Sequence, residues 1–181
     1  MRVAMRWYAF CFVALCAAGG SAALSAQGPM GAADAARPQA ALSTTLTVTV
    51  NGVPTVFSVP DLKTLPQRTV KVHNEHTKAD ETYTGVALSD VLATAGFTAS
   101  KATQRQMLRS YLHAEGTDAY WVVYSVTEVE GSEHEGDVIV AIGMNGGDLG
   151  NDGHFKLISS EDKKPQRWVR NLTAITMAPA Q

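Results

Sequence analysis

The chain has little cysteine. Of its 181 residues only two are cysteines, Cys11 and Cys16, and both lie near the amino terminus. The sequence after them therefore offers no thiolate for a disulfide, for a zinc or iron–sulfur site, or for nucleophilic catalysis. These absences exclude several classes of mechanism for the domain that follows.

An excess of charge of one sign is also absent. The chain carries 15 basic and 17 acidic side chains, a net charge of −2. Because nucleic-acid-binding domains present a clustered positive surface, no nucleic acid partner is expected. Hydrophobic residues make up 45% of the chain and charged residues 18%, which is ordinary for a soluble globular protein and excludes wholesale disorder.

The amino-terminal segment has the pattern of a secretory signal peptide. Arg2 and Arg6 precede an apolar run over 7–18, and small residues follow as far as Ala26. The run is too short to span a bilayer comfortably, so we expect cleavage between Ser21 and Ala26 and a periplasmic or secreted protein. An uncleaved anchor is the alternative. Removing this leader takes both cysteines and leaves 13 basic against 17 acidic side chains, a net charge of −4, and no stable membrane insertion is expected afterwards.

The rest of the chain divides into two parts. Residues 27–43 are rich in Ala, Gly and Pro without hydrophobic periodicity, which predicts a flexible linker after a signal peptide at 1–26. Residues 44–181 are expected to form one folded domain, since their length suits a single core.

This domain is predicted to belong to the α+β class, a mixed β-sheet domain with a few short helices. Alternation over 45–50 and extended residues over 54–59 flank Asn51-Gly52, which predicts a hairpin. Short helices are expected at 61–65, with Asp61 as cap, at 88–95 and at 100–109. Further strands are expected at 69–73, 81–84, 111–114, 120–124, 137–142 and 155–158, with a last apolar segment over 168–169 and 172–177. The continuous apolar runs at 137–142 and 155–158 indicate strands covered on both faces.

Four short segments carry more information than this periodicity. In chain order they read YTGVALSDVL over 83–92, AEGTDAY over 114–120, SVTEV over 125–129 and KKPQRWVRNL over 163–172. They resemble the Y-x-G-V-P-L-x-D-L-L, A-E-G-x-D-G-Y, S-x-x-E-L and closing basic–aromatic segments of the molybdopterin-binding domain of sulfite-oxidase-type oxidoreductases. Each motif alone is weak evidence, but their shared order and spacing argue against coincidence.

The resemblance implies a fold able to hold the molybdopterin cofactor. In catalytic members of this family, a cysteine at the end of the strand before the Y-x-G-V-P-L segment ligates molybdenum. Here that strand ends Val72-His73-Asn74, without a cysteine. Because imidazole differs from a thiolate in charge and polarisability, no cysteine-ligated molybdenum is expected, and sulfite oxidation by the family's usual mechanism is in doubt.

His73 and Asn74 are candidate cofactor-binding residues because they stand at this position of the family pattern. An imidazole can ligate a metal or carry a proton near neutral pH. We favour the plainer interpretation of His73 as a polar residue on the open face of a strand. His76 completes an H-x-x-H pair, but a charged loop usually meets solvent; no metal site is predicted, and His73 is kept as a candidate ligand.

The basic cluster after residue 162 supplies the other candidates. Lys164, Arg167 and Arg170 are placed to meet a cofactor phosphate, because guanidinium groups grip phosphate oxygens in a fork. A solvated basic turn is an equally good interpretation. Arg167 and Arg170 are the better candidates, since they flank Trp168, whose burial would hold their stems.

The glycine-rich stretch 143–153 is expected to be a long loop between strands. A phosphate loop would need a helix after it, whereas 155–158 reads as a strand. A calcium loop would need acidic or amide residues where Gly150 and Ser159 stand. By the resemblance, this connection skirts the cofactor cavity. Of the remaining histidines, His113 is expected on a strand and His134 in a surface loop.

The leading hypothesis is therefore an exported molybdopterin-binding domain whose partner is a small-molecule cofactor or ligand. The alternative is a non-catalytic periplasmic binding or accessory module that retains only the fold. The sequence does not identify a protein partner.

Overall fold

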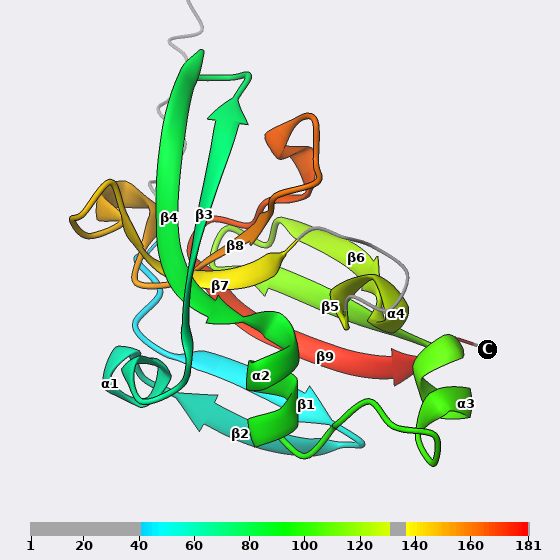
Figure 1. Cartoon of the computed structure of the whole chain (residues 1–181). Coiled ribbons are helices and arrows are strands. Elements are labelled where there is room, and N and C mark those ends of the chain that lie inside the picture. The colour runs from blue at the N-terminus through cyan, green and yellow to red at the C-terminus, as the bar shows by residue number, and fades with distance from the viewer. Residues whose placement is uncertain (1–40, 131–136, 181) are drawn as a thin grey trace, which may run out of the picture. The chain divides into compact units, whose positions relative to one another are not determined.

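The computed structural model describes residues 41–130 and 137–180 (Figure 1). The predicted signal peptide, almost all of the predicted linker and His134 lie outside these residues. Within them no helix is long and apolar enough to cross a membrane.

Short strands dominate the described chain. The strands are β1 (Leu46–Val50), β2 (Val53–Phe57), β3 (Gln67–Asn74), β4 (Ala79–Ala87), β5 (Ser110–Gly116), β6 (Trp121–Ser125), β7 (Val138–Met144), β8 (Lys156–Ser159) and β9 (Leu172–Pro179). The helices are α1 (Val59–Lys63), α2 (Leu88–Thr94), α3 (Gln104–Leu108) and α4 (Val126–Val129), with 3-10 turns η1 (Gly150–Asp152) and η2 (Pro165–Arg167). The predicted α+β class is confirmed.

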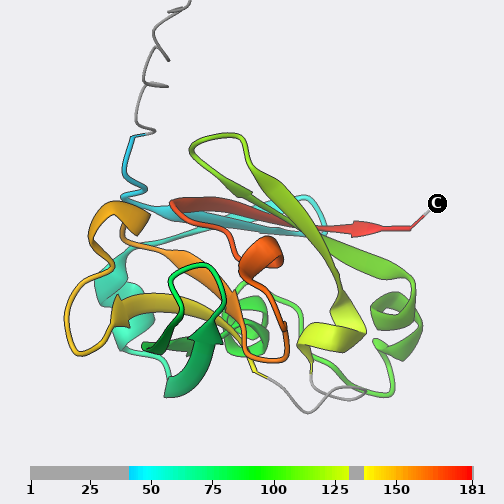
Figure 2. The same cartoon turned by 90° about the horizontal axis from the view of Figure 1, so that it is seen from above.

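The strands form two sheets. A five-stranded sheet has the order β2-β1-β9-β5-β6, and a four-stranded sheet has the order β3-β4-β7-β8. All neighbouring strands are antiparallel except β1 and β9, which run parallel. Figure 2 shows the five-stranded sheet as one layer, with the four-stranded sheet and the short helices on one side of it.

The larger core lies between the two sheets. Val48 of β1, Leu112 of β5 and Ile175 of β9 are fully buried there with Val140 of β7. A second cluster covers the other face of the four-stranded sheet and includes Ile139. Because neighbouring residues of β7 thus enter different clusters, the strand needs apolar side chains on both faces. The predicted two-sided burial is confirmed.

Helix α1 begins earlier than the sequence suggested. Ser58 is the N-cap: its hydroxyl accepts from the backbone N–H of Asp61 at 3.4 Å, and the Asp61 carboxylate accepts from the Ser58 N–H at 2.8 Å. This reciprocal capping box makes Asp61 the third residue of the helix. The prediction that Asp61 is the N-cap is therefore wrong. Asp61 is the acidic partner in the capping box, three residues after the N-cap Ser58.

The β3–β4 hairpin extends beyond the other strands (Figure 1). Its strands pair without interruption from Gln67 opposite Val86 to Asn74 opposite Ala79. Because side chains alternate along a strand, Asn74 is on the buried face, whereas His73 is on the exposed face. This one-residue difference decides which side chain reaches the interior.

Candidate functional site

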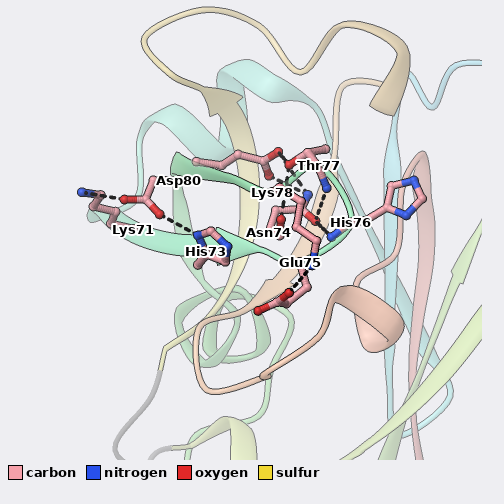
Figure 3. Close-up of polar contacts among 9 residues, drawn as sticks. Lys71, His73, Asn74, Glu75, His76, Thr77, Lys78 and Asp80 are labelled. Carbon is pink, nitrogen blue, oxygen red and sulfur yellow. Dashed lines mark hydrogen bonds and ion pairs between the residues drawn. The ribbon is translucent and has the colours of Figure 1, made fainter.

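The end of β3 is fixed by the buried side chain of Asn74 (Figure 3). Its amide nitrogen donates to both carboxylate oxygens of Glu81, at 3.1 and 2.9 Å. Its amide oxygen accepts from the backbone N–H of His76 at 2.9 Å. The Thr77 hydroxyl adds another bond to Glu81, at 2.9 Å. Asn74 therefore closes the hairpin, and its own polar groups are already in use.

His73 lies on the opposite face of the hairpin, in solvent. Its Nδ1 is 2.9 Å from the carboxylate of Asp80, which also pairs with Lys71 at 3.3 Å. These contacts, first that with His73 and then that with Lys71, lower the pKa of Asp80. Figure 3 shows His73 and His76 pointing to different sides of the turn. In the described part of the chain, no three His, Cys, Asp or Glu side chains gather into a metal-binding group.

A buried polar network continues inward from Glu81. The Tyr83 hydroxyl donates to Glu81 at 2.7 Å and accepts from the Lys156 ammonium at 2.7 Å. Lys156 also pairs with Asp152 at 2.7 Å. Burial raises the pKa of Tyr83, and the bond to Glu81 raises it further, so Tyr83 stays a neutral donor. Burial alone would raise the pKa of Glu81, but the bonds from Tyr83, Asn74 and Thr77 outweigh it and lower that pKa.

The network opens into a pocket of about 300 Å³. Cationic side chains reach it from separate parts of the chain: Lys156 from β8 and Arg170 from the segment before β9. Arg170 is exposed, and its Nε lies 4.0 Å from Asp152. The lining residues are Asn74, His76, Lys156, Pro165, Gln166, Trp168 and Arg170. The pocket therefore gathers two positive charges, of which Lys156 is held in place, with the carboxylate of Asp152 beside them.

The pocket continues past Trp168. An adjoining hollow of about 230 Å³ shares Pro165, Trp168 and Arg170 with it and adds Asp118 and Tyr120. Trp168 itself is held by a bond from its ring nitrogen to the Ser159 carbonyl at 3.1 Å. The indole thus forms a rigid floor common to both hollows.

Arg167 does not line this pocket. Its guanidinium pairs with Glu128 at 2.8 Å and with Asp162, and it lies over the Tyr124 ring at 4.6 Å. These carboxylates, Glu128 first, raise the pKa of Arg167 above its usual range. Lys164 is exposed outside the pocket lining. Of the five cofactor-binding residues predicted from the sequence, the structure brings Asn74 and Arg170 together and places His73, Lys164 and Arg167 elsewhere.

The glycine-rich loop borders different hollows. One of about 440 Å³ lies beside α1 and includes Leu149, Gly150 and Gly153. Another of about 540 Å³ includes Gly146 and Gly147. These spaces are larger than the Lys156 pocket, but each has Lys63 and Asp148 on its wall. Each of these walls offers one ammonium and one carboxylate, whereas two cations, Lys156 and Arg170, line the Lys156 pocket. The Lys156 pocket is therefore the better candidate for an anion.

The sequence interpretation did not identify four residues of this network as site residues: Lys156, Asp152, Tyr83 and Glu81. One signal could have found the first: a lysine inside an apolar strand that is covered on both faces must have a buried partner. Asp152, four residues earlier, is that partner. The contact between Lys156 and Tyr83 joins residues 73 positions apart, and no local pattern encodes it.

The pocket offers donors for the phosphate of molybdopterin but no thiolate for its metal. The ammonium of Lys156 and the guanidinium of Arg170 are the donors that a phosphate requires. At the position where the family pattern has its metal-binding cysteine, His73 faces solvent and Asn74 is bonded to Glu81. The described residues therefore hold donors for an anion, but no cysteine thiolate for molybdenum.

Comparisons with known proteins agree with this architecture. The family model described as oxidoreductase molybdopterin binding domain matches residues 35–154. The crystal structure of the sulfane dehydrogenase SoxCD from Paracoccus pantotrophus is similar, with a TM-score of 0.59 and 21% sequence identity. The similarity covers 77% of this chain and 40% of that chain, and at this identity it shows the fold alone. No curated protein matches the sequence.

Proposed function

Because the chain belongs to the oxidoreductase molybdopterin-binding domain family, we propose that it binds a molybdopterin-type ligand without anchoring molybdenum through a cysteine. The site is the pocket that Lys156 and Arg170 share. The observation that carries the proposal is the buried ammonium of Lys156, which is oriented toward this pocket wall by Tyr83 and Asp152.

The two cations have different roles in ligand binding. Lys156 is held in place, so its positive charge is available at a fixed position and needs no reorganisation when an anion arrives. Arg170 is 67% exposed and only loosely paired with Asp152, so its guanidinium is able to turn onto phosphate oxygens. Trp168 lines the pocket but is only 5% exposed, so it gives the pocket a rigid wall rather than a stacking surface.

No oxygen-transfer step is assigned to this chain. The family's redox chemistry depends on the bound metal, and the described residues supply no thiolate to hold it. The proposal does not extend to the activity of the sulfane dehydrogenase SoxCD, because this chain spans only 40% of the SoxCD chain it matches.

A second candidate is an accessory module that retains only the fold. The observation in its favour is that Asp152 already neutralises Lys156 at 2.7 Å, which lowers the attraction for a phosphate. In that case the purified protein carries no pterin.

The test is to produce the chain in a host that makes molybdopterin and to analyse the purified protein for oxidised pterin and for metal. We expect pterin with far less than stoichiometric molybdenum. Arg170→Ala should reduce the pterin content by about tenfold or more, the value of one charge-assisted bond. Arg105→Ala, at an exposed arginine on α3, is the matched control. Pterin-free wild-type protein would contradict ligand binding, and stoichiometric molybdenum would contradict the absence of a metal anchor.

We also propose that the domain is exported to the periplasm or beyond the cell, on the strength of the leader pattern alone. Cell fractionation and amino-terminal sequencing test this. The expected product begins after a cleavage between Ser21 and Ala26 and is found outside the cytoplasm. A full-length product in the cytoplasm would overturn the proposal.

A further inference from the structure

The two sheets have four edge strands, and three of them are protected. Strand β2 contains Pro54, which lacks an N–H for pairing. Strand β3 carries the charged residues Arg68 and Lys71, and charge on an edge discourages pairing. The outer side of β8 is occupied by Val169, whose backbone exchanges hydrogen bonds with Leu157 at 2.9 and 3.1 Å.

Strand β6 has none of these protections. Its sequence, Trp-Val-Val-Tyr-Ser, has no proline and no charged residue, and its pairing with β5 contains no bulge. In the part of the chain that the structure describes, no strand pairs with its other side. Trp121 and Val123 are 57% and 43% exposed. A neutral, apolar, flat edge is a template for another strand.

The backbone of β6 is free at alternate residues. Gly116 donates to the Tyr120 carbonyl at 2.9 Å across the β5–β6 turn, so the even-numbered residues of β6 bond to β5. In an antiparallel pair the intervening residues direct N–H and C=O away from the partner. These are Trp121, Val123 and Ser125, whose side chains are exposed. The carbonyl of Ser125, the N-cap of α4, also accepts the first bond of that helix. Among the described elements, the helices lie on the other side of this sheet (Figure 2).

We propose that β6 is a homodimer interface, in which two copies of this chain pair β6 with β6 in antiparallel fashion about a two-fold axis at Val123. In this register Val123 of each copy faces the other, and Trp121 faces Ser125. The outward N–H and C=O of Val123 then meet their complements, and the Ser125 N–H meets the Trp121 C=O, as an isologous interface requires. The two five-stranded sheets become one continuous ten-stranded sheet.

A second copy suits this edge better than a charged partner does. The strand carries no charge, so two copies bring no like charges together at the axis. The other edges of the same molecule do not accept β6, because β2 carries proline, β3 carries charge and β8 is already covered by Val169. An edge of five residues buries less than the roughly 800 Å² per partner of a standard interface. The dimer is therefore weak, with a dissociation constant between about 1 μM and 1 mM.

The first test is the mass of the purified full chain by sedimentation equilibrium across that concentration range. We expect a monomer–dimer equilibrium. Val123→Lys places two ammonium groups opposite each other and should weaken dimerisation by about tenfold or more. Val56→Lys is the matched control, because Val56 is an exposed valine, 61% exposed, on the opposite edge strand β2. A monomer at every concentration, open-ended assembly, or equal loss in both variants would overturn the proposal.

A distance measurement identifies the interface without altering β6. Thr176 of β9 pairs with His113 of β5, which pairs with Val123. Two Thr176 residues in the dimer are thus separated by five strand spacings, about 24 Å between Cα atoms. Spin labels at Thr176→Cys, with Cys11 and Cys16 replaced by serine, should report a concentration-dependent distance in this range. A dimer without it would place the interface on another surface and contradict the proposal.

Discussion

At the residue scale, packing explains why position 85 in the YTGV segment is a glycine. The pairing of β4 with β7 shifts register between Thr84 and Gly85, and a Cβ added at Gly85 would lie 2.1 Å from the Val140 carbonyl oxygen. Because backbone cannot move away cheaply, Gly85→Ala should lower the free energy of unfolding by about 3 kcal/mol. Urea denaturation followed by circular dichroism measures this. Gly147→Ala, where the nearest atom is 3.8 Å away, is the control; equal stability of both variants would refute the clash.

Glu130 gives a residue-scale prediction about pH. Burial, and then the charge of Asp90, raise the pKa of Glu130, and its Oε1 has no hydrogen-bond partner among the described residues. A pKa raised by folding favours the protonated native state, so this contribution is full below the unfolded pKa of about 4.3 and is lost as the pH rises through the folded pKa. Glu130→Gln should therefore raise the melting temperature near pH 7 and leave it almost unchanged near pH 4. The exposed Glu161→Gln serves as control, and a pH-independent gain would contradict the titration.

At the element scale, most strands could be predicted because burial imposes a period of two on the sequence. The hairpin of β1 and β2 was predicted in this way, whereas β7 and β8 were predicted from continuous apolar runs, because both of their faces are buried. It was harder to predict which face of β3 each site residue occupies, because one position separates His73 in solvent from Asn74 in the interior. Arg170 could be found from its chemistry and its place beside Trp168. The only local signal for Lys156 was its place in an apolar strand, and its contact with Tyr83 on a distant strand had none.

Substitutions at Arg167 and Arg170 are expected to affect different properties. Arg167 supports the stability of the fold, and Arg170 supports ligand binding. Arg167 joins η2 to α4 and β6: it pairs with Glu128 at 2.8 Å, and its carbonyl accepts from the Tyr124 hydroxyl at 2.7 Å. Arg167→Met leaves Glu128 and Asp162 without their cation and should cost about 2 kcal/mol of stability, less than a fully buried pair because solvent reaches the guanidinium. Arg170→Met should change stability by less than about 0.5 kcal/mol. Denaturation curves and pterin content of both variants test this, and a reversed pattern would contradict the assignment.

At the scale of the whole molecule, the last strand completes the sheet that the first strands begin. Strand β9 lies between β1 and β5 at the centre of the five-stranded sheet, and it is the parallel neighbour of β1. The family match ends at residue 154, before β8 and β9. The folding unit is therefore longer than the matched region, because the core between the sheets needs Leu172 and Ile175 from β9.

This arrangement predicts the effect of shortening the chain. A chain ending after residue 154 loses β8 and the central strand β9, so β1 and β5 have no neighbour between them and their buried faces are exposed to water. We expect no cooperative unfolding transition and no near-ultraviolet circular dichroism from it. A milder change, Ile175→Ala, should keep the fold and cost about 2–5 kcal/mol. Removing only Ala180 and Gln181, which follow β9, is the control and should leave a cooperative transition. A folded 154-residue product would show that the sheet closes without its central strand and would refute this account of the fold.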